Sequence, residues 1–75
     1  MRTIREIAQE IRKDWHPIHF AARPYVDSML QLETVTDRYG FDDARGILLY
    51  FLGNASSWRG ETARRIKAEI KAMLK

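Results

Sequence analysis

The sequence predicts an all-α fold, a small bundle of about four helices around an apolar third helix. Apolar residues recur at i, i+3 and i+4 in both the first and the last segment, which is typical of amphipathic helices. The segment "ILLYFL" at 47–52 is apolar on every side, as expected of a central helix. No second strand-like segment is evident to pair with it, and a lone strand would leave backbone groups unsatisfied. The length of 75 residues predicts one domain over residues 1–75.

The first helix is expected at about residues 3–15. Thr3 and Glu6 have the spacing of a capping box, in which each side chain accepts a hydrogen bond from the other residue's backbone N–H. Pro17 ends the helix, because the residue before a proline is disfavoured in the α region. The apolar stripe of this helix consists of Ile4, Ile7, Ala8, Ile11 and Trp15.

The second helix is expected to be shorter and to have Pro24 in its first turn, where the missing N–H costs nothing. The β-branched run at 34–36 weakens a helix. Two C-terminal ends of this helix are therefore possible. In one, the helix stops near residue 33 and a short turn follows at 36–39; in the other, it continues to Gly40, which acts as a left-handed C-cap. We favour the earlier end. The inward face consists of Tyr25, Val26, Met29, Leu30 and Leu32.

The third helix is expected to be capped by Asp42 or Asp43 and to end at Gly53. Ser56 or Ser57 is expected to cap the fourth helix, over about 58–74. Gly60 would then lie in the first turn of that helix, where glycine costs about 1 kcal/mol relative to alanine. This cost suggests that another part of the backbone approaches Gly60 closely.

Composition excludes several classes of protein. Hydrophobic residues make up 45% of the chain, which supports a core and argues against disorder. There is no cysteine, hence no disulfide and no thiolate metal site. No apolar run approaches the ~20 residues of a membrane span, and the N-terminal segment lacks the apolar region of a signal peptide. We therefore expect a soluble, cytoplasmic protein without a membrane partner.

The sequence offers little for catalysis or metal binding. His16 and His19 stand three apart, but Pro17 interrupts the helix between them and no third ligand is evident. Zinc sites need three or four ligands. Ser56 and Ser57 lack the G-x-S-x-G frame of a nucleophile, and no phosphate-binding glycine motif is present. A domain of this size also has little room for a cofactor pocket of ~300 Å3. We expect no enzyme, no cofactor, no metal and no small-molecule substrate.

The last segment carries most of the positive charge. Residues 58–75 hold six basic and two acidic side chains, a net of +4 in a chain whose total is +3. Several of the basic residues share one helical face, whose spacing suits nonspecific contact with phosphates. The alternative is an ordinary solvated helix face, since Lys and Arg are good helix formers and Glu61 and Glu69 dilute the charge. The candidate nucleic-acid contacts are Arg59, Arg64, Arg65, Lys67, Lys71 and Lys75.

The chain also has more large aromatic and aliphatic residues than a core of 75 residues can hide. The candidate exposed anchors for a protein partner are Trp15, Tyr39 and Trp58, with Arg59 beside the last. An exposed Trp/Arg pair is typical of interface hot spots. For Trp58 we favour the alternative, in which its ring packs in the core between helices.

Four segments together resemble a small uncharacterised family from prophages and other mobile elements of Gram-positive bacteria. The segments are "TIREIA", "RPYVDSM", "YGFDDAR" and "LYFLGNASSWRGETARRIKAEIKAML". The likeness covers nearly the whole chain but contains no catalytic motif, so it implies no site residues. It implies a bacterial or phage cytoplasmic setting and an accessory role.

The predicted function is therefore that of a non-catalytic, phage-type accessory protein. It would act as a small helical protein-binding module, an adaptor whose partner is another protein or a second copy of this chain. The alternative is a nucleic-acid-binding protein that uses its basic C-terminal helix.

Overall fold

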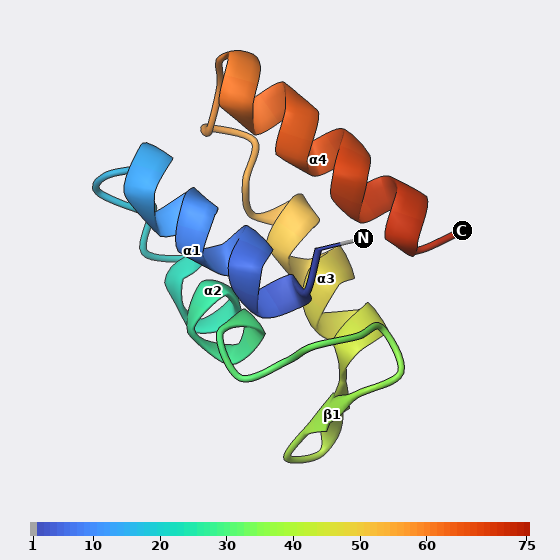
Figure 1. Cartoon of the computed structure of the whole chain (residues 1–75). Coiled ribbons are helices and arrows are strands. Elements are labelled where there is room, and N and C mark those ends of the chain that lie inside the picture. Colours follow the sequence, from blue (N-terminus) through green and yellow to red (C-terminus); the bar gives the residue numbers. More distant parts are fainter. Residues whose placement is uncertain (1) are drawn as a thin grey trace.

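The computed structural model describes residues 2–75, which form four helices and one two-stranded hairpin (Figure 1). α1 packs against both α2 and α4, and α2 packs in turn against α3. The prediction of a mostly helical fold is confirmed, but the prediction of a purely helical one is wrong because of the hairpin. In chain order the elements are α1 (Ile4–Asp14), α2 (Arg23–Met29), β1 (Arg38–Tyr39), β2 (Asp42–Asp43), α3 (Ala44–Gly53) and α4 (Glu61–Met73).

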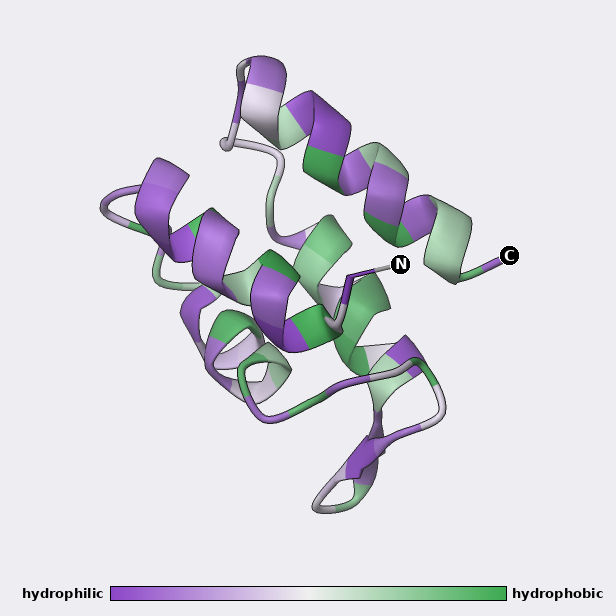
Figure 2. Cartoon of the chain, in the orientation of Figure 1, coloured by the Kyte–Doolittle hydropathy of each residue, from purple (hydrophilic) through white to green (hydrophobic). Residues whose placement is uncertain are grey.

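α1 forms as its sequence predicts. The Glu6 backbone N–H donates to Thr3 Oγ1 at 3.1 Å, and the Thr3 N–H donates to Glu6 Oε1 at 2.8 Å, which completes the capping box. Ile4, Ile7 and Ile11 are fully buried. Figure 2 shows α3 mostly in hydrophobic colours, while hydrophilic colours follow the solvent sides of α1 and α4. α2 packs most closely against α3, and the Trp15 ring at the end of α1 meets Phe51 of α3.

α2 ends at Met29, before either predicted end and nearer to the favoured one. The next residues turn back to the start of α1. There the N–H groups of Ile4 and Arg5 donate to the carbonyls of Glu33 and Leu32 at 2.9 and 3.0 Å. The first N–H groups of a helix have no partner within it, so these carbonyls act as a cap from a distant segment.

A turn at residues 34–37, which ends at Asp37, leads from this segment into the hairpin before α3. The Asp37 carboxylate accepts the backbone N–H groups of Glu33 and Thr34 at 2.8 and 3.1 Å, which lowers its pKa. The Asp37 carbonyl accepts the Ala44 N–H at 2.8 Å. The starts of α1 and α3 are therefore tied to the same turn.

The hairpin replaces the simple turn predicted near residues 36–39. Arg38 pairs with Asp43 and Tyr39 with Asp42 in an antiparallel register. Gly40 has a φ of +65°, as glycine commonly does in a two-residue hairpin loop. Strands of two residues are too short to show a period-2 pattern, so the sequence does not predict them.

α3 is capped by Asp43, whose carboxylate accepts the Gly46 N–H at 2.7 Å. Leu48 and Phe51 are fully buried, but Leu49 and Tyr50 are each 58% exposed. The prediction that α3 is shielded on every side is therefore wrong for one face. A chain this small has too few elements to surround its central helix completely.

α4 begins at Glu61, three residues later than predicted, and neither Ser56 nor Ser57 caps it. The N-cap is Gly60, which has a φ of 115° and a ψ of −178°. A Cβ at Gly60 would meet no atom of residues 2–75 within 4 Å, so the expected close backbone approach is also wrong. The glycine is required by this conformation, which side chains disfavour.

None of the helices in residues 2–75 has both the length and the apolar character that a membrane span requires.

Gly60 and Gly53 offer a matched test of whether the backbone conformation requires glycine at position 60. An added Cβ meets open space at both positions, and of the two only Gly60 has a positive φ. Gly60→Ala is expected to lower the free energy of unfolding by about 1–3 kcal/mol. Gly53→Ala, within a helix, is expected to be neutral or to stabilise by up to ~1 kcal/mol. Urea denaturation measures both, and equal effects would contradict the explanation.

Candidate functional site

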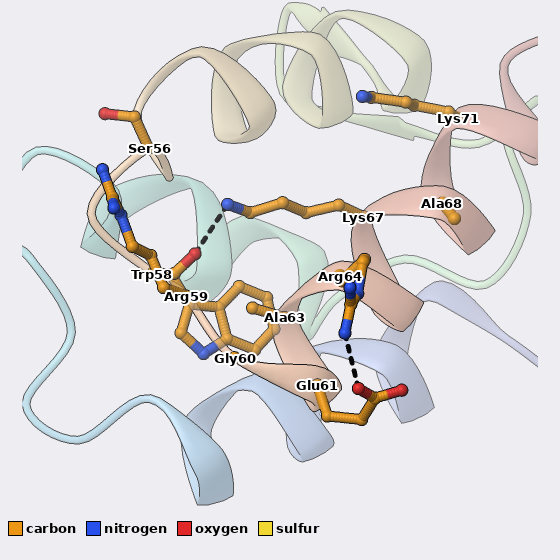
Figure 3. A pocket seen from close by; sticks show the side chains of 10 residues that line it. All are labelled: Ser56, Trp58, Arg59, Gly60, Glu61, Ala63, Arg64, Lys67, Ala68 and Lys71. Atoms are coloured by element: carbon orange, nitrogen blue, oxygen red, sulfur yellow. Dashed lines mark hydrogen bonds and ion pairs between the residues drawn. The ribbon is translucent and has the colours of Figure 1, made fainter.

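Four of the predicted basic residues line one open hollow at the start of α4. Its volume is about 640 Å3, and its walls come from α4 and the loop before it (Figure 3). We call Arg59, Arg64, Lys67 and Lys71 the α4 cationic surface. The other lining residues are Ser56, Trp58, Gly60, Glu61, Ala63 and Ala68.

Lys67 reaches across this hollow to the preceding loop. Its Nζ donates to the backbone carbonyl of Trp58 at 2.7 Å and lies 6.0 Å from the centroid of the Trp58 ring (Figure 3). Partial burial lowers the pKa of Lys67, and the neighbouring charges of Lys71 and Arg59 lower it further. Positive charges are thus crowded here without enough negative charge to balance them.

Glu61 is the carboxylate among the lining residues. Its Oε1 accepts a hydrogen bond from Arg64 Nη2 at 2.6 Å, and both side chains are largely exposed. An exposed ion pair of this kind contributes little to the free energy of folding. Arg64 can therefore leave Glu61 and pair with the anion of a ligand at low cost. Within residues 2–75, no ion pair engages Arg59, Lys67 or Lys71.

The other two predicted contacts lie apart from the hollow. Lys75 does not line it. Arg65 pairs instead with Glu10 of α1. Arg2 bridges the same carboxylate and Glu69, with both nitrogen–oxygen distances at 2.7 Å. Arg65 therefore belongs to a charge network that joins α1 to α4, which helical spacing alone does not reveal.

The predicted protein anchors divide in a similar way. Trp58 and Trp15 are only 3% and 9% exposed, so the exposed-anchor prediction is wrong for both and core packing is confirmed for Trp58. Their rings stack at 5.5 Å with an interplanar angle of 7°, and each meets Phe51 edge-on. Trp58 Nε1 donates to Asp14 Oδ2 at 2.9 Å. Tyr39 remains 47% exposed on the hairpin.

Several exposed hydrophobic side chains were missed by the sequence analysis. Phe41 is fully exposed in the hairpin loop, and Phe20 is 76% exposed. Leu49 and Tyr50 form the open face of α3, where Tyr50 stacks on Tyr25 at 5.5 Å. The signal for Phe41 was its position between Gly40 and two aspartates, a composition typical of a turn.

His16 lies in a second hollow, of about 810 Å3, on α1 and the start of α2. His19 instead packs edge-on against Phe20 at 4.8 Å. Across residues 2–75, no three His, Asp or Glu side chains lie close enough together to hold a metal ion. The second hollow is also basic, with Arg12, Lys13 and Arg23 in its walls.

Comparison with protein-family models, curated proteins and solved structures finds no match to this chain. The resemblance to a family of mobile elements thus stays a prediction.

The Glu10 network predicts a pH dependence of stability. Hydrogen bonds from Arg65 and then Arg2 lower the pKa of Glu10 in the folded state. The stabilisation is therefore present above the unfolded pKa of about 4.3 and is lost as pH falls through the lower folded value. We expect Glu10→Gln to reduce the free energy of unfolding at pH 7, with a smaller deficit at pH 3.

Urea denaturation at a series of pH values measures this deficit. Glu33→Gln is the matched control, because its pair with Arg5 is more exposed and should contribute less. A Glu10→Gln deficit that stays constant from pH 7 to pH 3 would contradict the role of this carboxylate.

Proposed function

We propose that this protein is a non-catalytic binding module that docks onto another protein through the hairpin at residues 38–43. The observation that carries the proposal is the full exposure of Phe41 in the hairpin loop. The hairpin projects from the helical body below the start of α3 (Figure 1). Removing a phenylalanine side chain from water contributes roughly 1.5–3 kcal/mol to the free energy of binding. Burial of Phe41 in a partner would therefore contribute substantially to affinity.

The hairpin presents Phe41 on an ordered backbone. The strand pairing and the positive φ of Gly40 define the loop, and Arg38 Nη2 donates to the Phe41 carbonyl at 3.3 Å. At the base, the Asp43 cap joins β2 directly to α3. A group that is ordered before binding loses less conformational entropy in the complex. This arrangement supports a role for Phe41 as an anchor.

The neighbouring side chains indicate the chemistry of the partner. Tyr39 and Arg38 are exposed beside the loop, and aromatic and arginine side chains are enriched in interface hot spots. Asp42 adds an exposed carboxylate. The proposed partner has an apolar pocket that accepts a phenyl ring, with a basic group at its rim to meet Asp42.

The proposed setting is the cytoplasm of a bacterium that carries a mobile element, where the module has an accessory role. The sequence resemblance supports this setting, and the absence of a catalytic motif supports the non-catalytic role.

The test compares Phe41→Ser with Phe20→Ser, a matched loss of an exposed phenylalanine elsewhere. A partner captured from the host is purified, and its affinity for each variant is measured by calorimetry. Phe41→Ser is expected to weaken binding about 30-fold or more, as for a hot spot of about 2 kcal/mol, while Phe20→Ser binds as the unchanged chain does. Circular dichroism should show both variants folded.

Equal affinities for Phe41→Ser and the unchanged protein would refute the docking role of the hairpin. Sedimentation equilibrium tests self-association in the same set of proteins. Dimers of the unchanged chain that dissociate in Phe41→Ser would identify the partner as a second copy.

A further inference from the structure

The fold separates the charges of α4 onto two sides. On the side facing α1, Arg65 and Glu69 pair with Glu10 and Arg2. On the other side lie Arg64, Lys67 and Lys71, with Glu61 as the carboxylate among the lining residues. Glu69 therefore pairs with Arg2 on the α1 side and does not offset the positive charges on the other side. The α4 cationic surface is more positive than the sequence alone implies.

The spacing of this surface suits a chain of phosphates. Arg64 and Lys71 are seven residues apart, so their Cα atoms are separated by about 10 Å along the helix axis. That distance equals the axial rise of about three nucleotides in one strand of B-DNA, at about 3.4 Å each. Lys67 lies between them, and Arg59 extends the row into the preceding loop (Figure 3).

The hollow holds its positive charges close together. Lys67 is held by the Trp58 carbonyl, and its pKa is lowered by burial and by Lys71 and Arg59. A bound anion would offset this mutual repulsion. The surrounding wall is uncharged at Ser56, Ala63 and Ala68, so a ligand meets no second acidic group there.

We infer that the α4 cationic surface binds the phosphate backbone of double-stranded nucleic acid without reading its base sequence. Lysine and arginine contacts to phosphate position a protein on a duplex but carry no sequence information. Single-strand binding usually adds aromatic side chains on which bases stack. The aromatic ring beside this hollow, Trp58, is buried in the core and cannot serve that purpose. Duplex is therefore the favoured form.

The test is fluorescence anisotropy of a labelled duplex of arbitrary sequence, titrated with the full chain between ~50 and ~200 mM salt. Three or four phosphate contacts predict a slope of about −2.7 to −3.6 for log K against log salt. A triple variant, R64Q/K67Q/K71Q, is expected to lose binding at ~50 mM salt. Scrambling the duplex sequence should change the affinity less than twofold.

The control variant, R12Q/K13Q/R23Q, removes the same charge from the second hollow on α1 and α2. It should keep at least half of the affinity of the unchanged protein, and thermal melts should show both triple variants folded. Phe41→Ser should bind duplex normally, so this inference and the proposed protein docking fail independently.

Two results would overturn the inference. The unchanged chain could show no duplex binding at ~50 mM salt. The two triple variants could weaken binding equally, which would assign it to net charge alone. In the first case, binding to phosphatidylserine vesicles would make the surface a lipid site.

Discussion

The packing of Trp58 against Trp15 and Phe51 is the constraint on which the rest of this structure depends. The two indole rings stack at 5.5 Å, Phe51 meets each edge-on, and the Trp58 indole N–H donates to Asp14. The cluster thereby joins the C-terminal end of α1, the C-terminal part of α3 and the loop before α4. Large aromatic side chains dominate core energetics, and their buried polar atoms need partners. Here Asp14 supplies that partner.

Burial of Trp58 also shapes the surface. Two residues after Trp58, Gly60 has a positive φ and is the N-cap from which α4 begins. In the same loop, the Trp58 carbonyl accepts a hydrogen bond from the Lys67 ammonium. Arg65 and Glu69 then face α1, while Arg64, Lys67 and Lys71 border the hollow. Trp58 therefore contributes its ring to the aromatic core and its carbonyl to the cationic surface. The Phe41 hairpin, at the other end of α3, is built separately.

The helices could be predicted from the sequence because their signals are local. The capping box of α1, the apolar periods of α1 and α4, and the Asp43 cap all depend on neighbours within about four residues. The errors arose where distant residues decide the outcome. Trp58, which was expected in the first turn of α4, packs on Trp15 in the loop before it, and Arg65 is separated from Arg64 by its pairing with Glu10 on another helix. The hairpin was missed because two-residue strands have no period to detect. The basic residues of the candidate site were predicted from the sequence. Their separation into Arg64, Lys67 and Lys71 at the hollow and Arg65 in the network with α1 was not.

The measurement that tests this account most directly is nuclear magnetic resonance of the Trp58 indole. The account predicts that the Trp58 Nε1–H exchanges with solvent only on opening of the core, because it is 3% exposed and bonded to Asp14. It also predicts ring-to-ring nuclear Overhauser effects between Trp58 and Trp15. An indole proton that exchanges as fast as free tryptophan, without contacts to Trp15, would contradict it.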